Sequence, residues 1–178
     1  MILPRIQVCL VLLLTALLGA QDLTVVLFRH GERVSIWDGD SPLSEAGERR
    51  AQALVPLLES FHPSALYASD KQRTQQTLAP LAAKLGLKPA VRPKDESAAL
   101  AAEILKEHRG QTVLVCWHHD LMKKLAKGLG VRGPIPYWGL DSYNRIWVVR
   151  VSGQGEATLE EQSQSQPVSV RSLATQRP

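Results

Sequence analysis

The sequence predicts an α/β protein, a three-layer sandwich in which a mostly parallel central sheet is flanked by helices. Three observations support this fold class. Short apolar segments of strand length alternate along the chain with longer segments whose apolar residues recur at helical spacing. The apolar fraction of 44% and the charged fraction of 21% are typical of a globular protein. The length of 178 residues allows one domain with a substantial core.

The predicted strands are short and rich in apolar residues, as expected for strands that are buried on both faces of a covered sheet. The clearest are residues 23–28, with the sequence LTVVLF, and residues 111–117, with the sequence QTVLVCW. In chain order, the predicted strands are residues 23–28, 64–69, 88–93, 111–117 and 145–151.

The predicted helices lie between the strands. Ser44 is a predicted N-cap, and Glu45 and Glu48 follow it in the first turns, where acidic side chains interact favourably with the helix dipole. Gly86 and Gly110 are predicted to end two of the helices. In chain order, the predicted helical segments are residues 43–61, 70–87, 97–110 and 118–130.

The two ends of the chain differ in composition from the middle. Residues 1–20 hold one positive charge, then an apolar stretch over residues 6–18, then small residues, which is the pattern of a secretory signal peptide. The apolar stretch is short for a membrane span, so we expect no stable span and an exported protein, periplasmic or secreted, with an uncleaved N-terminal anchor as the alternative. We expect the folded domain to occupy residues 21–152. Residues 153–178, rich in Gln, Ser and Glu, are predicted to form a flexible tail.

Composition and spacing argue against several classes of partner. The formal net charge is +4 and the positive charges are scattered, so we expect no nucleic-acid partner. Cys116 is the sole cysteine after residue 20 and lies in a predicted strand, so no disulfide framework is expected. No cysteine or acidic spacing accompanies His30, His118 and His119 in the manner of a zinc site, so we expect no metal and no cofactor.

Polar clusters follow three of the predicted strands. Arg29 and His30 follow the first strand, residues 69–73 (SDKQR) end and follow the second, and residues 118–120 (HHD) follow the fourth. The loops at the carboxyl ends of parallel strands lie along one edge of such a sheet and form its binding site. We therefore expect the three clusters to lie around one cavity.

The residue types in these clusters suit phosphoryl chemistry. Arg29 and Arg73 carry planar, permanently charged guanidinium groups that can bind a phosphate through two hydrogen bonds. His30 and His118 can act as nucleophile, acid, base or hydrogen-bond donor near neutral pH. Together these side chains would neutralise a dianionic phosphoryl group and stabilise the charge that develops during its transfer.

Four segments, in order, carry a resemblance to a known family: LFRHGER, PLSEAGERRAQAL, LYASDKQRTQQTLAPLA and TVLVCWHHD. They resemble branch 1 of the histidine phosphatase superfamily, which includes the cofactor-dependent phosphoglycerate mutases. The resemblance covers roughly residues 23–151 and implies a phosphoglycerate mutase-like fold.

The resemblance also implies roles for individual residues. His30 would be the nucleophile that becomes phosphorylated. Arg29 and Arg73 would bind the phosphate, and His118 would donate a hydrogen bond to the transferred phosphoryl group. Gly31 would let the backbone turn closely at the substrate pocket.

Three features depart from the family pattern. Ile36 lies six residues after His30, where the mutase-like members of the family carry an asparagine, which argues against a specific mutase assignment. His118 is followed by His119 and Asp120, so His119 is an alternative for the second histidine; the length of the preceding strand favours His118 and makes His119 a wall of the substrate pocket. The usual glutamate motif of the acid that protonates the leaving group is absent. Asp95 is our first candidate for that acid, Glu96 and Asp120 are alternatives, and a site without such an acid is a further alternative.

Taken together, these features predict a metal-independent phosphomonoester hydrolase that works through a phosphohistidine on His30. The segment between Arg73 and His118 has room for one strand and one helix but no large lid, so we expect an open site. An open site admits either a phosphorylated small molecule or a phosphorylated macromolecule. The alternative hypothesis is a phosphate-binding or interaction module of the same fold with weak or no catalysis.

Overall fold

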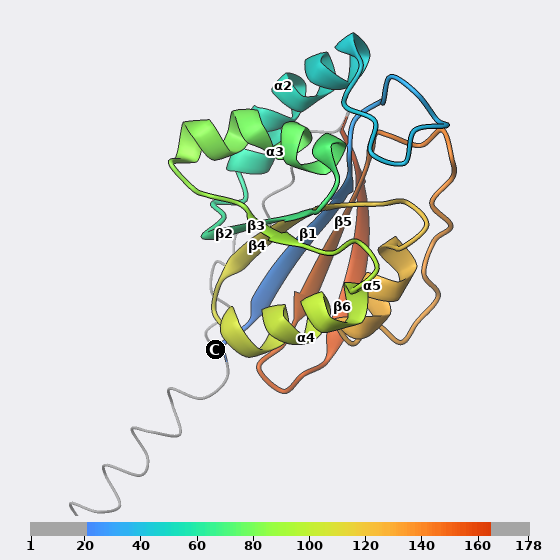
Figure 1. Ribbon diagram of the computed structural model, residues 1–178. Coiled ribbons are helices and arrows are strands. Elements are labelled where there is room, and N and C mark those ends of the chain that lie inside the picture. The colour runs from blue at the N-terminus through green and yellow to red at the C-terminus, as the bar shows by residue number, and fades with distance from the viewer. Residues whose placement is uncertain (1–20, 165–178) are drawn as a thin grey trace, which may run out of the picture.

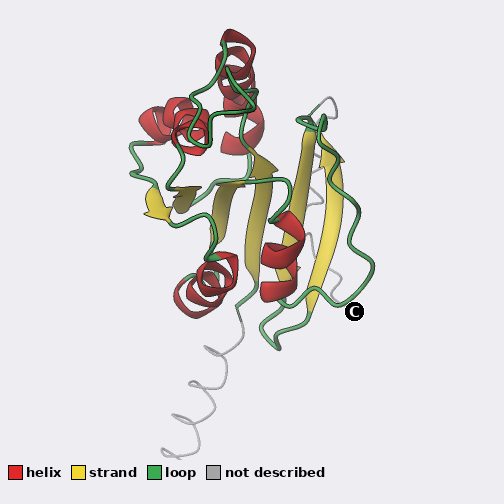
Figure 2. Cartoon of the chain, turned by 45° about the vertical axis from the view of Figure 1, so that its right-hand side comes forward, coloured by secondary structure: helices red, strands yellow, loops and turns green. Residues whose placement is uncertain are grey.

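The computed structural model describes residues 21–164 as one α/β unit of three layers (Figures 1 and 2). The strands, in chain order, are β1 (Leu23–Arg29), β2 (Ala65–Ser69), β3 (Ala90–Arg92), β4 (Thr112–Trp117), β5 (Arg145–Val151) and β6 (Ala157–Ser163). The helices are α2 (Glu45–Glu59), α3 (Gln72–Leu85), α4 (Ser97–Glu107) and α5 (Met122–Gly128). The predicted signal peptide, residues 1–20, lies outside the described residues.

The sheet is mixed and mostly parallel, with the strand order β3-β2-β4-β1-β5-β6. β4 is parallel to both β1 and β2, and β3 is parallel to β2. β5 runs antiparallel to β1, and β6 runs antiparallel to β5. The predicted α/β fold class is therefore confirmed, with the antiparallel strands confined to one side of the sheet.

The core lies on both faces of the sheet because successive side chains of a strand point to opposite faces. In β1, Val25 and Leu27 pack in the cluster that contains the buried side chains of α4 and α5. Val26 and Phe28 pack in the other cluster, against α2 and α3. This two-sided burial explains why β1 is apolar at nearly every position, since each residue faces a layer of helices.

The helix ends follow the sequence signals. The Ser44 side chain caps α2 by accepting a hydrogen bond from the backbone N–H of Gly47. Gly86 ends α3 with a φ of 65°, a left-handed conformation that glycine adopts without steric cost.

The prediction of a flexible tail from residue 153 is wrong for residues 157–163. They form β6, which pairs with the whole of β5, and ion pairs join Arg145 to Glu161 and Arg150 to Glu160 across the two strands. β6 is polar because it is an edge strand whose side chains are half-buried or exposed, so its composition resembles that of a disordered segment. The remainder of the predicted tail, residues 165–178, lies outside the described residues.

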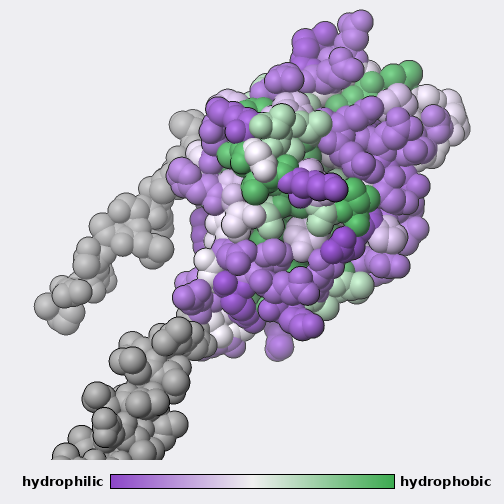
Figure 3. Space-filling model, turned by 60° about the vertical axis from the view of Figure 1, so that its left-hand side comes forward, coloured by the Kyte–Doolittle hydropathy of each residue, from purple (hydrophilic) through white to green (hydrophobic). Residues whose placement is uncertain are grey.

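The opposite edge of the sheet is formed by the short strand β3, where Val91 is exposed. Seen from the left-hand side of Figure 1, the surface is mostly hydrophilic, with smaller hydrophobic areas between the polar side chains (Figure 3). Within residues 21–164, no helix has the length and hydropathy needed to cross a membrane.

Candidate active site

The carboxyl ends of three neighbouring parallel strands bring the predicted clusters together. Arg29 is the last residue of β1, and His30 follows it; Arg73 lies in the first turn of α3, after β2; His118 follows β4. Because β1 and β2 both flank β4, these side chains meet at one edge of the sheet. They surround a cavity of about 140 Å³, here called the strand-end cavity, which is lined by Arg29, His30, Arg33, Arg73, Lys94, His118, His119, Asp120 and Leu121.

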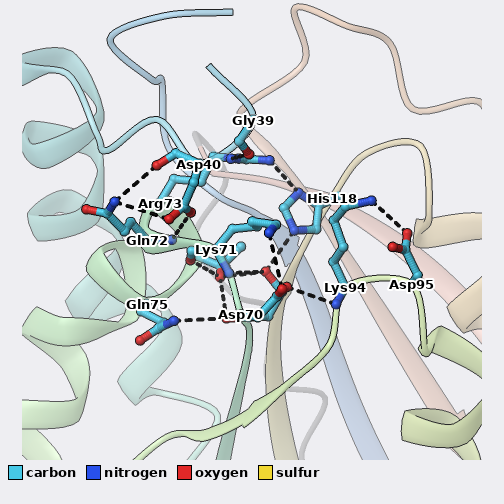
Figure 4. Close-up of polar contacts among 12 residues, drawn as sticks. Gly39, Asp40, Asp70, Lys71, Gln72, Arg73, Gln75, Lys94, Asp95 and His118 are labelled. Atoms are coloured by element: carbon cyan, nitrogen blue, oxygen red, sulfur yellow. Dashed lines mark hydrogen bonds and ion pairs between the residues drawn. The ribbon is translucent and has the colours of Figure 1, made fainter. Parts of the chain in front are cut away.

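Arg73 connects the two predicted catalytic histidines. Its Nε donates a hydrogen bond to Nε2 of His30 at 3.1 Å, and its Nη2 donates to Nδ1 of His118 at 3.3 Å. Its Nη1 donates to the backbone oxygen of Gly39 at 3.0 Å, so all three nitrogens are fixed (Figure 4). The guanidinium group therefore lies between the histidines, where it can contact an anion bound to either.

His30 is held in one tautomer. Its Nδ1 lies 2.7 Å from the backbone oxygen of Gly31, which can only accept, so Nδ1 carries the proton. Nε2 then keeps its lone pair. Burial, followed by the positive charge of Arg73, lowers the pKa of His30 to about 2, because the charged imidazolium is unfavourable in this environment. At neutral pH, His30 is a neutral imidazole with a nucleophilic Nε2.

His118 is oriented by a chain of hydroxyl groups. Since its Nδ1 accepts from Arg73, its Nε2 carries the proton and donates to the Ser69 hydroxyl at 2.8 Å. Ser69 contacts the hydroxyl of Thr74 at 2.9 Å. Burial, and then the charge of Arg73, lowers the pKa of His118 to about 3. The ring centroids of His30 and His118 are 5.4 Å apart, so the two imidazoles face the same small space.

Arg29 is tethered by the loop before β5. Its Nη1 donates to the backbone oxygens of Gly139 and Leu140, and its Nη2 donates to the Tyr143 hydroxyl at 3.2 Å. The guanidinium also lies over the Tyr143 ring, 3.9 Å from its centre. Its Nε is buried and has no hydrogen-bond partner among the described residues. A buried guanidinium donor without a partner is costly.

Gly31 is required for close contact between two backbones rather than for a special turn. A Cβ at Gly31 would lie 2.9 Å from Cα of Gly47 in α2, and a Cβ at Gly47 would lie 2.2 Å from the backbone oxygen of Glu32. The same oxygen accepts a hydrogen bond from the backbone N–H of Ser44. The Leu-Ser-x-x-Gly pattern therefore places the first turn of α2 directly against the loop that carries His30.

Asp95, the first candidate for the acid, does not line the strand-end cavity. Its carboxylate forms an ion pair with Nζ of Lys94 at 2.6 Å and its side chain is 76% exposed. In the view of Figure 4, Lys94 lies between His118 and Asp95. Glu96 does not line the cavity either, whereas Asp120 does. Asp120 is the only carboxylate among the residues that line the cavity.

His119 lies on the cavity wall, as expected of a pocket residue. Its side chain is 22% exposed and its Nδ1 lies 4.0 Å from the Asp120 carboxylate. Burial, with Arg29 as the next cause, lowers the pKa of His119. The hydrogen bonds to Arg73 and Ser69 belong to His118, so the structure brings His118 rather than His119 against the other predicted catalytic side chains.

Sequence reasoning missed two cations of the cavity and the tyrosine that holds Arg29. Arg33 and Lys94 both line the strand-end cavity. Arg33 lies two residues after the Arg-His-Gly segment, and that proximity is a signal for a place near the site. Lys94 and Tyr143 lie in loops with no local pattern. Among residues 21–164, no group of three or more His, Cys, Asp or Glu side chains is arranged to hold a metal ion.

Part of the chain matches a known protein family and a known phosphatase. Residues 25–96 match the model of the histidine phosphatase superfamily, branch 1. The 8-oxo-(d)GTP phosphatase of Mycolicibacterium smegmatis is 43% identical over 67 residues, which cover 35% of this chain and 21% of that protein. This chain thus matches only about a fifth of that relative's length.

Two solved structures show the same fold. A mycobacterial glucosyl-3-phosphoglycerate phosphatase superposes with a TM-score of 0.63 at 17% identity, over 81% of this chain and 99% of that one. The protein histidine phosphatase SixA, solved with tungstate, superposes with a TM-score of 0.59 at 22% identity, over 79% of this chain and 97% of that one.

Proposed function

We propose that the chain, whose residues 25–96 match branch 1 of the histidine phosphatase superfamily, hydrolyses phosphomonoesters through a phosphohistidine on His30. The observation that carries the proposal is the arrangement around Arg73. One guanidinium group contacts Nε2 of His30 and Nδ1 of His118, while the neighbouring Arg29 lines the same cavity. These groups present positive charge and a neutral nucleophile to one small cavity.

In the first step, the lone pair on Nε2 of His30 attacks phosphorus and forms a P–N bond. The P–O bond to the leaving group breaks, and its electron pair stays on the ester oxygen. The imidazole ring gains positive charge in this step. The hydrogen bond that its Nδ1–H donates to the Gly31 carbonyl oxygen stabilises that charge. The Arg73 Nε–H, which donates to Nε2, transfers its hydrogen bond to a phosphoryl oxygen when that lone pair is used.

We assign the proton donor for the leaving oxygen to Asp120, the carboxyl group that lines the cavity. In the second step, the Asp120 carboxylate accepts a proton from water as the water oxygen attacks phosphorus. The P–N bond breaks, its electron pair returns to Nε2 of His30, and inorganic phosphate leaves. Asp120 is then protonated again and Nε2 of His30 has regained its lone pair, so both side chains are in their starting states.

Hydrolysis of an aryl phosphate tests the role of His30, because a phenolate leaving group needs little assistance from an acid. We expect the wild-type chain to hydrolyse p-nitrophenyl phosphate in the presence of a chelator, and His30→Ala to be inactive. Mass spectrometry after an acid-free quench should find phosphate on His30. A folded wild-type chain as inactive as His30→Ala would favour the alternative of a binding module, and equal activity in both would place the chemistry elsewhere.

A matched pair of carboxylate variants tests the acid. With an alkyl phosphate, Asp120→Asn should lower kcat/KM by about 10²-fold or more, the usual contribution of a positioned acid. With p-nitrophenyl phosphate, the kcat/KM of the same variant should stay within about threefold of the wild-type value, because this leaving group is already stable as an anion. Asp95→Asn, which changes an exposed partner of Lys94, should leave kcat/KM unchanged for both substrates. Equal losses on both substrates would argue against Asp120 as the donor.

A further inference from the structure

A second cavity adjoins the strand-end cavity. It has a volume of about 360 Å³ and shares two wall residues with the strand-end cavity, His119 and Asp120. Its other walls come from Lys123 of α5, from the loop before β5 and from β5 itself, and they include Tyr137, Trp138 and Trp147. We call it the aromatic cavity. Its size and its mostly apolar, aromatic lining are those of a site for a small organic group.

The aromatic walls are of two kinds. Trp138 and Trp147 are buried and pack edge to face, with ring centroids 4.8 Å apart. Tyr137 also lines the cavity and is 78% exposed. A large aromatic side chain exposed beside a preformed cavity offers a face on which a planar ligand can stack.

Trp147 supplies an unsatisfied donor. Its side chain is fully buried, and its Nε1–H has no hydrogen-bond partner among the described residues. Buried tryptophan N–H groups normally find an acceptor, and leaving one unpaired costs about 1–3 kcal/mol. By contrast, Nε1 of Trp138 donates to the backbone oxygen of Ser142 at 2.8 Å. This nitrogen is itself buried and does not reach the surface of the aromatic cavity, so the aromatic rings rather than this donor define what the cavity can bind.

The loop that forms the cavity is held to the sheet. Arg145 at the start of β5 donates a hydrogen bond to the Tyr137 backbone oxygen, and it forms an ion pair with Glu161 of β6 at 2.5 Å. The Arg145 guanidinium also lies 5.9 Å from the Trp138 ring centre. The aromatic cavity is therefore formed before any ligand binds, which reduces the entropic cost of binding.

We propose that the aromatic cavity binds the leaving group of the phosphomonoester and selects a planar aromatic ring. The proposal rests on the proposed function, since it takes the strand-end cavity as the phosphoryl site. Asp120 borders both cavities. With the phosphoryl group in one cavity and the leaving group in the other, the ester oxygen that joins them lies beside Asp120. His119 then separates the two sites as a shared wall.

Binding of phosphonates tests the proposal without any turnover, because a C–P bond is not hydrolysed at this site. The probes are benzylphosphonate and propylphosphonate, measured by calorimetry on the full chain. We expect benzylphosphonate to bind at least tenfold more tightly. Tyr137→Ala should reduce this ratio at least threefold, while propylphosphonate affinity stays unchanged.

Trp37→Ala is the matched control, because Trp37 is 91% exposed and lines neither cavity. It should leave both affinities at the wild-type values. Equal wild-type affinities for the two phosphonates, or a ratio that Tyr137→Ala leaves intact, would overturn the proposal.

If the ring preference holds but the wild-type chain fails to hydrolyse p-nitrophenyl phosphate, the proposed hydrolysis fails while the aromatic ligand site stands.

Discussion

The two adjoining cavities are built in different ways. The strand-end cavity is formed at the ends of β1, β2 and β4, and its central side chains are buried and fixed by hydrogen bonds. The aromatic cavity is formed by a loop that reaches over β5, and its side chains are aromatic and in part exposed. The sheet edge thus holds the charged groups in fixed positions, while the loop before β5 supplies an aromatic surface beside them.

The two cavities are also physically connected. The loop that carries the aromatic walls continues to Leu140 and Tyr143, which hold the guanidinium group of Arg29. A change in this loop therefore reaches the strand-end cavity through one arginine.

The largest effect is expected where only the strand-end cavity is changed. Arg73→Met removes the charge between His30 and His118 and should lower kcat/KM for p-nitrophenyl phosphate by about 10²–10³-fold, the usual loss for one stabilising donor. Arg73→Lys should recover little of this, because a single ammonium group cannot contact both histidines as the guanidinium does. Benzylphosphonate and propylphosphonate should weaken together, since neither variant touches the aromatic wall.

Arg150→Met is the control, since Arg150 pairs with Glu160 far along the sheet and does not line either cavity. It should retain wild-type kinetics. Activity of Arg73→Met within threefold of wild type would contradict the assignment of Arg73 to the phosphoryl site.

The next effect concerns the cost of burying neutral histidines in the strand-end cavity. The pKa values of His30 and His118 in the folded chain lie far below the ordinary value of about 6.5. As the pH falls, these two histidines therefore bind protons in the unfolded chain before they do so in the folded chain. The contribution of these neutral histidines to stability is fully present above about pH 6.5 and is lost as the pH falls toward 3. Between pH 7.5 and 5.0, each histidine should lower the free energy of unfolding by about 2 kcal/mol.

Urea unfolding in buffers free of phosphate and sulfate measures this loss. His118→Asn should show a pH-dependent loss smaller than that of wild type by about 2 kcal/mol. His62→Asn, at an exposed loop position, should keep the wild-type loss. If the wild-type chain and His118→Asn lose the same free energy, His118 does not titrate as the burial of its ring requires.

The smallest effect is expected at the connection between the cavities. Tyr143→Phe removes the hydroxyl that accepts a hydrogen bond from Arg29 but keeps the ring that lies against the guanidinium. Losing one such bond should cost about 0.5–1.5 kcal/mol in kcat/KM for p-nitrophenyl phosphate. Tyr143→Leu, which also removes the ring, should cost more. Wild-type kinetics in both variants would show that the loop does not position Arg29.

Much of the strand-end cavity could be predicted because its geometry follows from local patterns. The apolar run before Arg29 predicts a buried strand, and the same is true of the run before His118. Parallel strands then force their following residues to one edge, so the meeting of Arg29, His30, Arg73 and His118 required no knowledge of loops. The close contact of Gly31 with Gly47, in contrast, is visible only once α2 is packed against the loop.

The acid and the last strand show where sequence patterns stop being informative. Asp95 and Asp120 both follow predicted strands, and only the paths of their loops decide that Asp120 reaches the cavity while Asp95 pairs with Lys94. β6 lacks an apolar pattern because an edge strand buries little, and its pairing with β5 comes from backbone hydrogen bonds and cross-strand ion pairs.

The sequence by itself determined the α/β class, the order of the strands and helices up to β5, and the four charged or titratable side chains at the sheet edge. It did so because burial imposes a periodicity on strands and helices that can be read locally. Only the tertiary structure decided the tautomers of the two histidines, the carboxylate at the cavity, the pairing of β6 and the aromatic cavity. These depend on contacts between residues far apart in the chain, and such contacts leave no periodic trace in the sequence.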